Sequence, residues 1–172
     1  MPARKRPLWQ RLLRDLLIVA LIFGVVNWVQ TRSVPDGPAP AFEARLATGQ
    51  SIALHDWLAT HPGQAVGVYF WAEWCPICKA QESTITRLRE DWPVLTVAMQ
   101  SGDAPAVRAH LAQRTLDWPA VVDFDGALTR SFGLNAVPGF VIIAPDGTIR
   151  SASVGLSSSW GLRLRLWWAE TM

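Results

Sequence analysis

The stretch that decides the fold is Trp71-Ala72-Glu73-Trp74-Cys75-Pro76-Ile77-Cys78-Lys79, which follows a nearly continuous apolar run at residues 65–70. The 172-residue chain has two cysteines, and both lie in this stretch with two residues between them. An apolar strand-like run, then Cys-x-x-Cys, then a helical pattern predicts a redox pair rather than half of a zinc site. No histidine stands beside the pair at a metal-ligand spacing, so a metal site is the weaker alternative.

The spacing of the two cysteines has a chemical consequence. Two intervening residues let both sulfurs meet on the first turn of a helix, where a disulfide can close and reopen with little backbone movement. There Cys75 faces unpaired backbone amides and the positive end of the helix dipole, which favour its thiolate. We therefore predict Cys75 as the nucleophile and Cys78 as the resolving thiol, with Pro76 suited to the first helical turn.

This motif resembles the active site of the thioredoxin superfamily, which often has the pattern Trp-Ala-x-Trp-Cys-x-x-Cys-Lys. A second motif, Val137-Pro138, stands just before a β-rich run. In that superfamily this proline is cis and packs against the cysteines, and the residue before it offers its backbone to the substrate. The resemblance implies substrate-binding roles for Val137 and Pro138, with Trp74 as an exposed apolar platform beside Cys75.

The sequence departs from this pattern near the resolving thiol. Thioredoxin has a buried acid near the end of the strand before its cysteines, and Tyr69 holds that place here. Glu82, one turn beyond Cys78, is a candidate proton acceptor, because similar proteins have an acid in this helix. Gln81 occupies the offset where that acid is expected, and a solvated surface role for Glu82 is the alternative.

The N-terminal segment predicts a membrane anchor. Residues 1–14 are rich in Arg and Lys, and an unbroken apolar run follows at residues 16–26. Trp9 and Trp28 would lie roughly 28 Å apart on a continuous helix, about the thickness of the hydrocarbon core. We predict a cytoplasmic basic tail at 1–14 and an uncleaved transmembrane anchor at 15–31, with signal-peptide cleavage as the alternative. The formal charge of +2 owes much to this tail and gives no argument for nucleic-acid binding.

The remainder predicts one folded domain. Residues 32–41 are rich in Pro and Gly and suggest a semi-extended linker that holds the domain off the membrane. Residues 42–172 have the length of a single compact domain. Alternating and apolar patterns predict strands at 42–46, 51–54, 66–70, 94–99, 120–122, 141–144 and 148–151, and helices at 55–58, 76–91, 103–114, 127–132 and 160–170.

This order predicts an α/β thioredoxin-like fold, a mixed sheet flanked by helices, preceded by one transmembrane helix. The N-terminal hairpin and the helical insertion near residues 101–118 resemble those of the TlpA/ResA/DsbE group of membrane-anchored thiol-disulfide oxidoreductases. The Cys-Pro-Ile-Cys core is most similar to that of the ScsD-like proteins. The last helix alternates Arg163 and Arg165 with leucines before Trp167 and Trp168. A packed helix is favoured there, and a membrane-surface contact is the alternative.

We therefore expect a protein thiol-disulfide oxidoreductase that uses the Cys75–Cys78 pair and needs no metal or organic cofactor. Pro76 and Ile77 lack the histidine found in the most oxidising members of the family, which favours a reductant or an isomerase-like role. The resemblance implies exported cysteine-containing substrates, a membrane thiol donor or acceptor, and a periplasmic domain at a bacterial inner membrane. Cytochrome c maturation and thiol protection under copper stress are the expected contexts. The alternatives are a disulfide-introducing oxidase, a copper-binding chaperone and a binding module with an inert cysteine pair.

Overall fold

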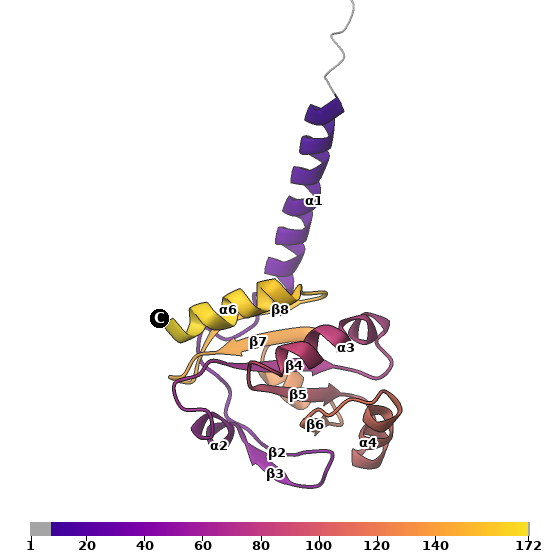
Figure 1. Ribbon diagram of the computed structural model, residues 1–172, viewed down its shortest axis with the longest axis vertical. Helices are drawn as coiled ribbons and strands as arrows, with labels where there is room; N and C mark the ends of the chain where they lie inside the picture. The colour runs from indigo at the N-terminus through magenta and orange to yellow at the C-terminus, as the bar shows by residue number, and fades with distance from the viewer. Residues whose placement is uncertain (1–7, 172) are drawn as a thin grey trace, which may run out of the picture.

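The computed structural model describes residues 8–171, except for the side chains of Leu8, Arg11 and Phe23. A long helix rises from a domain in which helices cover both faces of a mixed sheet (Figure 1). The elements are α1 (Leu8–Thr31), β1 (Gly37–Pro38), β2 (Glu43–Arg45), β3 (Ser51–Ala53), α2 (Leu54–Ala59), β4 (Val66–Trp71), α3 (Pro76–Leu88), β5 (Val94–Met99), α4 (Ala104–Gln113), β6 (Ala120–Asp123), α5 (Ala127–Ser131), β7 (Gly139–Ile143), β8 (Thr148–Val154) and α6 (Ser159–Thr171).

The main sheet has six strands in the order β1-β8-β7-β4-β5-β6. Strand β4 is central and pairs in parallel with β5 and antiparallel with β7. Each of its residues is buried, because its apolar side chains alternate between two hydrophobic cores. Tyr69 and Trp71 face the core under α3, α4 and α6, which we call the α3-side core, whereas Val68 and Phe70 face the core under α2 and α5. The predicted thioredoxin-like α/β fold is confirmed.

The two additions to the fold form as expected. Strands β2 and β3 pair as an antiparallel hairpin. A bridge between Leu46 and Val121 connects this hairpin to the main sheet. Helix α4 begins after Asp103, whose side chain accepts a hydrogen bond from the Ala106 amide at 3.0 Å. The polar N-cap followed by Pro105 thus starts this helix as the sequence indicated.

The segment at residues 32–41, expected to act as a spacer, is packed against the domain instead. Gly37 and Pro38 form β1, which pairs with the edge strand β8. The backbone of Ser33 lies so close to Gly133 that a Cβ atom there would collide with it, and Gly133 has a positive φ of 70°. Strand β1 forms by pairing with residues more than a hundred positions away, so residues 32–41 carry no apolar pattern of their own. Their Pro- and Gly-rich composition therefore indicated a free linker.

Helix α1 has the length and composition of a membrane span. Its residues Leu12–Thr31 have a mean hydropathy of 2.0, and this stretch is not buried inside the protein. The helix begins at Leu8, earlier than the predicted anchor at 15–31, and residues 1–7 of the predicted basic tail lie outside the described part of the chain. Helix α1 remains a candidate span by length and composition, and the orientation of the chain remains a prediction.

Candidate active site

The two cysteines lie where β4 ends and α3 begins, and they form a disulfide with their Cα atoms 5.2 Å apart. Cys75 is the N-cap residue of α3, and its Sγ accepts a hydrogen bond from the Cys78 amide at 3.1 Å. Pro76 takes the first helical turn, where no amide proton is needed. This geometry places Cys75 Sγ against the positive end of α3, which stabilises a thiolate at that atom in the reduced protein.

The Val137–Pro138 peptide is cis, as the family resemblance implied, and it lies beside the disulfide. The Val137 carbonyl oxygen is 3.8 Å from Cys75 Sγ. The topology explains the contact: β7 runs antiparallel to β4 with Gly139 opposite Phe70, so the residues before β7 meet the residues after β4. Pro138 is buried, and its carbonyl accepts a hydrogen bond from the Gly155 amide at 2.8 Å.

Exposed apolar side chains border the buried sulfurs. Cys75 and Cys78 are 4% and 3% exposed, whereas Trp74 is 56% exposed and Ile77 is 48% exposed. The Trp74 ring is fixed by its Nε1, which donates to the Gln100 carbonyl at 3.1 Å. Trp74 therefore lies where the resemblance implied an apolar platform. Ile77 extends the same apolar border, and its exposure was not predicted from the sequence.

Ser101 is a supporting residue that the sequence reasoning missed. Its Oγ accepts a hydrogen bond from the Glu73 amide at 3.0 Å and donates to the Met99 carbonyl at 3.0 Å. The side chain is 1% exposed, so both hydrogen bonds are shielded from water. Ser101 thereby ties the loop that leads to Cys75 to the end of β5. A small polar residue two places after a buried strand was the only sequence signal for this contact.

Glu82 is engaged with Arg114 rather than with a cysteine. Its Oε2 accepts from Arg114 Nη2 at 2.6 Å and from Arg114 Nε at 3.0 Å. The Glu82 side chain is 13% exposed, and the hydrogen bonds that Arg114 donates to it raise the pKa of the Arg114 guanidinium. Within residues 8–171 no hydrogen bond joins Glu82 to Cys75 or Cys78. The carboxylate is one turn from Cys78 along α3, and its proton-acceptor role remains a prediction.

Two buried polar side chains lie in the α3-side core near the cysteines. Burial, and secondarily the charge of Glu82, raises the pKa of Tyr69, so its hydroxyl stays protonated at neutral pH. Gln81 shares the buried face of α3 with Cys78, and its Oε1 accepts from the Ser157 amide at 3.3 Å. In the described part of the chain, Tyr69 Oη and Gln81 Nε2 have no hydrogen-bond partner. A neutral phenol, Tyr69, therefore stands at the position where thioredoxin has an acid.

Away from the cysteines, the described residues include no metal-ligating cluster, and some of them line a hollow. Residues 8–171 contain no group of three or more His, Cys, Asp or Glu side chains placed to hold a metal ion. A hollow of about 560 Å³ lies between α2 and the turn that joins β7 to β8, at the opposite end of β4 from Cys75. The chemistry that the structure supports is dithiol–disulfide exchange at the Cys75–Cys78 pair.

Comparison with known proteins agrees with this geometry. Residues 35–152 match the model of the AhpC/TSA family. A thioredoxin-like protein from Haemophilus influenzae is 32% identical over 104 residues, which cover 60% of this chain and 62% of that protein. The Thiol:disulfide interchange protein DsbE homolog from Paracoccus denitrificans is 29% identical over 152 residues, covering 84% of each chain.

Solved structures show the same fold. A crystal structure of a protein described as a thiol:disulfide interchange protein DsbE, from Chlorobium tepidum, superimposes with a TM-score of 0.70. That match covers 80% of this chain and 99% of the other at 23% identity. The chain belongs to the AhpC/TSA family and is a thioredoxin-like thiol-disulfide oxidoreductase whose disulfide pair is Cys75–Cys78.

Proposed function

We propose that this protein is a membrane-anchored reductant of disulfides in exported proteins. The observation on which the proposal rests is the position of Cys75 Sγ, at the start of α3 and 3.8 Å from the Val137 carbonyl. A backbone carbonyl beside the nucleophile, bordered by exposed Trp74 and Ile77, suits an extended peptide with an apolar side chain next to its cysteine. Such a surface fits a protein substrate better than a small molecule that needs an enclosed pocket.

In the proposed reaction, the Cys75 thiolate attacks one sulfur of a substrate disulfide. The substrate S–S bond breaks, a Cys75–substrate disulfide forms, and one substrate thiolate leaves and takes up a proton. Cys78 then loses its proton and attacks Cys75 Sγ, which releases the second substrate thiol and closes the Cys75–Cys78 disulfide. Two electrons have passed to the substrate, so a thiol donor must reduce the pair again before the next cycle.

The proposed direction rests on the residues around the nucleophile. Pro76 and Ile77 place no cation between the cysteines, so this dipeptide adds nothing to the stabilisation that the start of α3 and the Cys78 amide give the thiolate. A reduced form with little extra stabilisation belongs to a reductant, because strong oxidants are those whose reduced form is strongly stabilised. A disulfide-introducing oxidase would run the same steps backward and is the competing direction.

The proposed location is the periplasmic side of a bacterial inner membrane, with the N-terminus in the cytoplasm. Its support is α1, a candidate span at the N-terminal side of the domain, and the basic residues that precede it in the sequence. A membrane thiol donor would then restore the Cys75–Cys78 dithiol. Cytochrome c maturation and thiol protection under copper stress are the proposed contexts, in which exported proteins must be kept reduced.

Trapping of the mixed disulfide tests the proposed substrate class. In the full chain, Cys78→Ser removes the resolving thiol, so substrates should accumulate as disulfide adducts of Cys75 when the variant is expressed in a bacterial host. Cys75→Ser is the matched control and should give no adducts. Adducts with exported cysteine-containing proteins are the expected result. Adducts at equal levels in both variants, or in neither, would contradict the proposal.

A further inference from the structure

The outer face of α6 is apolar, although it has no partner within the described protein. The helix buries Leu162, Leu166 and Ala169 against the α3-side core. The positions on the opposite side would be polar in a helix that faces water. Instead, the exposed large side chains are Trp160, Leu164, Trp167 and Trp168, preceded by Leu156 in the loop before the helix, and we call these five residues the α6 outer face.

The exposed fractions show how fully these side chains are uncovered. Trp160 is 84% exposed, Leu164 is 65% exposed, and Trp167 and Trp168 are 56% and 57% exposed. Positions 160, 164, 167 and 168 recur at the spacing of one helix face, so they form one continuous stripe. A stripe of this kind is unfavourable in water, because its apolar surface gains free energy when it is removed from water.

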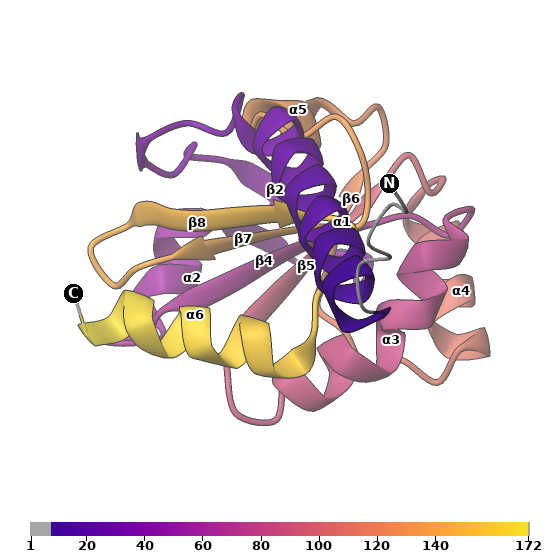
Figure 2. The same ribbon diagram turned by 90° about the horizontal axis from the view of Figure 1, so that it is seen from above.

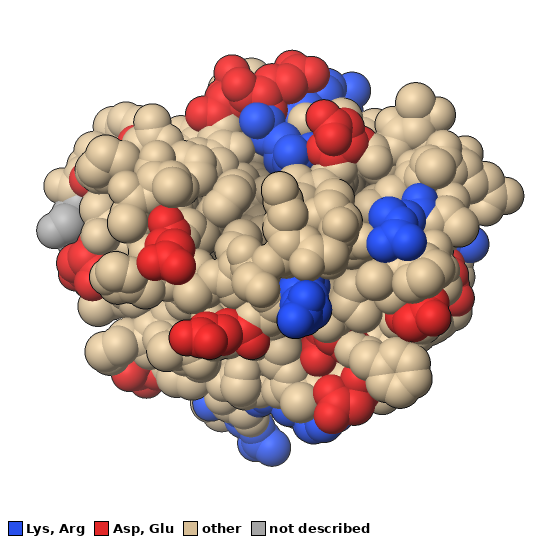
Figure 3. Space-filling view, turned by 90° about the horizontal axis from the view of Figure 1, so that it is seen from below, with Lys and Arg blue, Asp and Glu red and all other residues tan. Residues whose placement is uncertain are grey.

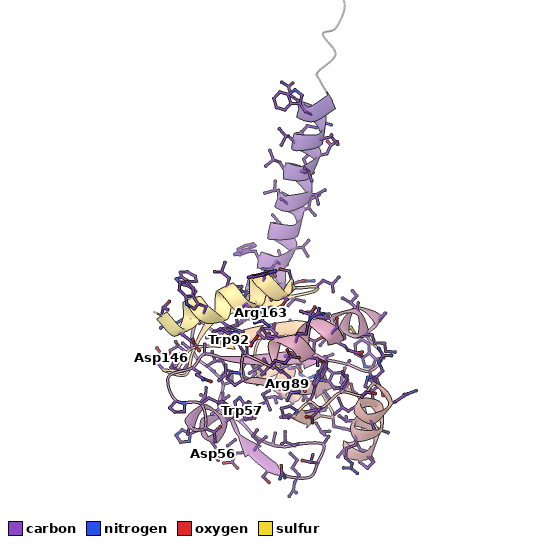
Figure 4. All side chains as sticks on the ribbon, in the orientation of Figure 1. Asp56, Trp57, Arg89, Trp92, Asp146 and Arg163 are labelled. Carbon is purple, nitrogen blue, oxygen red and sulfur yellow. A yellow bond between two sulfur atoms is a disulfide. The ribbon has the colours of Figure 1, made fainter. Side chains whose placement is uncertain are left out.

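The charged side chains of α6 are used within the domain rather than on this stripe. Arg163 forms an ion pair with Asp91, and Figure 4 places Arg163 and Trp92 on the domain side of the helix. Arg165 Nε donates to Ser151 Oγ at 3.1 Å, and burial lowers the pKa of its guanidinium. Glu170 accepts a hydrogen bond from the Ala65 amide at 3.0 Å. The polar groups therefore fix α6 on the domain and leave its outer face apolar.

The position of α1 indicates what covers this face. In Figure 1, α6 lies across the foot of α1, on the side of the domain from which α1 rises. Viewed from that side in Figure 2, α6 lies uncovered beside α1. The opposite side of the domain, in Figure 3, has acidic and basic side chains scattered over it, as a water-facing surface should.

The junction between α1 and the domain is held by several contacts. Asn27 Oδ1 accepts a hydrogen bond from the Val154 amide at 3.4 Å, and α1 lies against β8. The Thr31 carbonyl accepts from the Val34 amide at 2.9 Å, and the backbone of Ser33 packs on Gly133. With α1 across the bilayer, these contacts would set α6 in the plane of the membrane surface.

We propose that the α6 outer face lies in the headgroup region of the same phospholipid bilayer that α1 spans. Tryptophan and leucine on one side of a helix, with polar contacts on the other, are the composition of helices that lie in the membrane interface. The strands of the main sheet run across the axis of α1 in Figure 1, and Cys75 follows the end of β4. The active site would then point along the membrane surface, within reach of both a membrane thiol donor and exported substrates.

This inference rests on the proposed anchoring by α1, and photo-crosslinking can test the two separately. The full chain would be reconstituted in vesicles of phosphatidylethanolamine and phosphatidylglycerol, with p-benzoylphenylalanine placed at one position at a time. Trp167 reports on the α6 outer face, and Leu21, 68% exposed in the middle of α1, reports on the span. Phe124, 69% exposed in the loop after β6, is the matched exposed aromatic control.

Phospholipid adducts, measured by mass spectrometry, should form at positions 21 and 167 and be absent or far weaker at 124. Adducts at 21 without adducts at 167 would overturn the inference and leave the anchoring intact. No adduct at 21 would overturn the anchoring and the inference with it. A crosslink from 167 to a second copy of the chain in place of lipid would also refute it. Disulfide-exchange turnover by each labelled chain verifies that it is folded.

Discussion

Removal of the Ser101 hydroxyl should loosen the active-site loop by a measurable amount. Ser101→Ala deletes the acceptor of the Glu73 amide and the donor to the Met99 carbonyl, both at 3.0 Å, in a side chain that is 1% exposed. A buried amide left without a partner costs about 1–3 kcal/mol. A loss of about 2 kcal/mol lowers the melting temperature of a chain of this size by roughly 4–8 °C.

The assay is thermal unfolding of the full chain in detergent, followed by tryptophan fluorescence, together with the rate of disulfide exchange. Ser131→Ala is the matched control, because Ser131 is exposed and its hydroxyl donates only to the Leu128 carbonyl. That change should alter the free energy of unfolding by no more than about 0.5 kcal/mol. Ser101→Ala should also slow exchange, since the loop that positions Trp74 and Cys75 loses its tie to β5. Equal melting temperatures for the two variants would refute the reasoning.

Three further predictions concern the surroundings of the cysteines. Tyr69→Phe should raise the free energy of unfolding by about 1 kcal/mol in urea titrations, because the buried hydroxyl has no hydrogen-bond partner among the described residues. A lower free energy of unfolding would mean that the hydroxyl does have a partner. Glu82→Gln and Arg114→Met break the same ion pair, and Arg114→Met should destabilise the fold more in urea titrations, because it leaves the Glu82 carboxylate, 13% exposed, without its cation. Slower resolution of the mixed disulfide in Glu82→Gln alone would assign the proton-acceptor role to that carboxylate. Desolvation lowers the pKa of His110 in the folded state, so the unfolded chain binds the proton first as pH falls. The free energy of unfolding should therefore decrease as the pH drops below about 6.5. His110→Gln should make this decrease smaller, which melting curves at a series of pH values would measure.

The sequence predicted most of the fold because its strands are apolar runs. Strand β4 is buried on both faces, and its composition alone required a central position. The predicted end of the α3 helix at residue 91 was three residues late, because the chain turns after Leu88, where the Asp91 amide donates to the Leu88 carbonyl at 3.2 Å. Strand β1 was missed because Gly37 and Pro38 have no apolar pattern and form a strand only through pairing with β8.

Some residues of the candidate site were likewise predicted from the sequence, and others were not. Cys75, Cys78 and the cis Val137–Pro138 peptide followed from motifs, because short covalent spacing and a family resemblance constrain them. Ser101 was not predicted, because its role depends on where the loop after β5 meets the loop after β4. The ion pair between Glu82 and Arg114 joins two helices, so sequence distance gave no sign of it.

The equilibrium reduction potential of the Cys75–Cys78 pair tests the central claim most directly. The full chain would be equilibrated with glutathione buffers, and its thiols would then be trapped by alkylation and counted. We expect a value near that of thioredoxin, about −270 mV, which would make the protein a reductant that needs a membrane thiol donor. A value near −120 mV would contradict this account, because such a potential belongs to an oxidase that introduces disulfides.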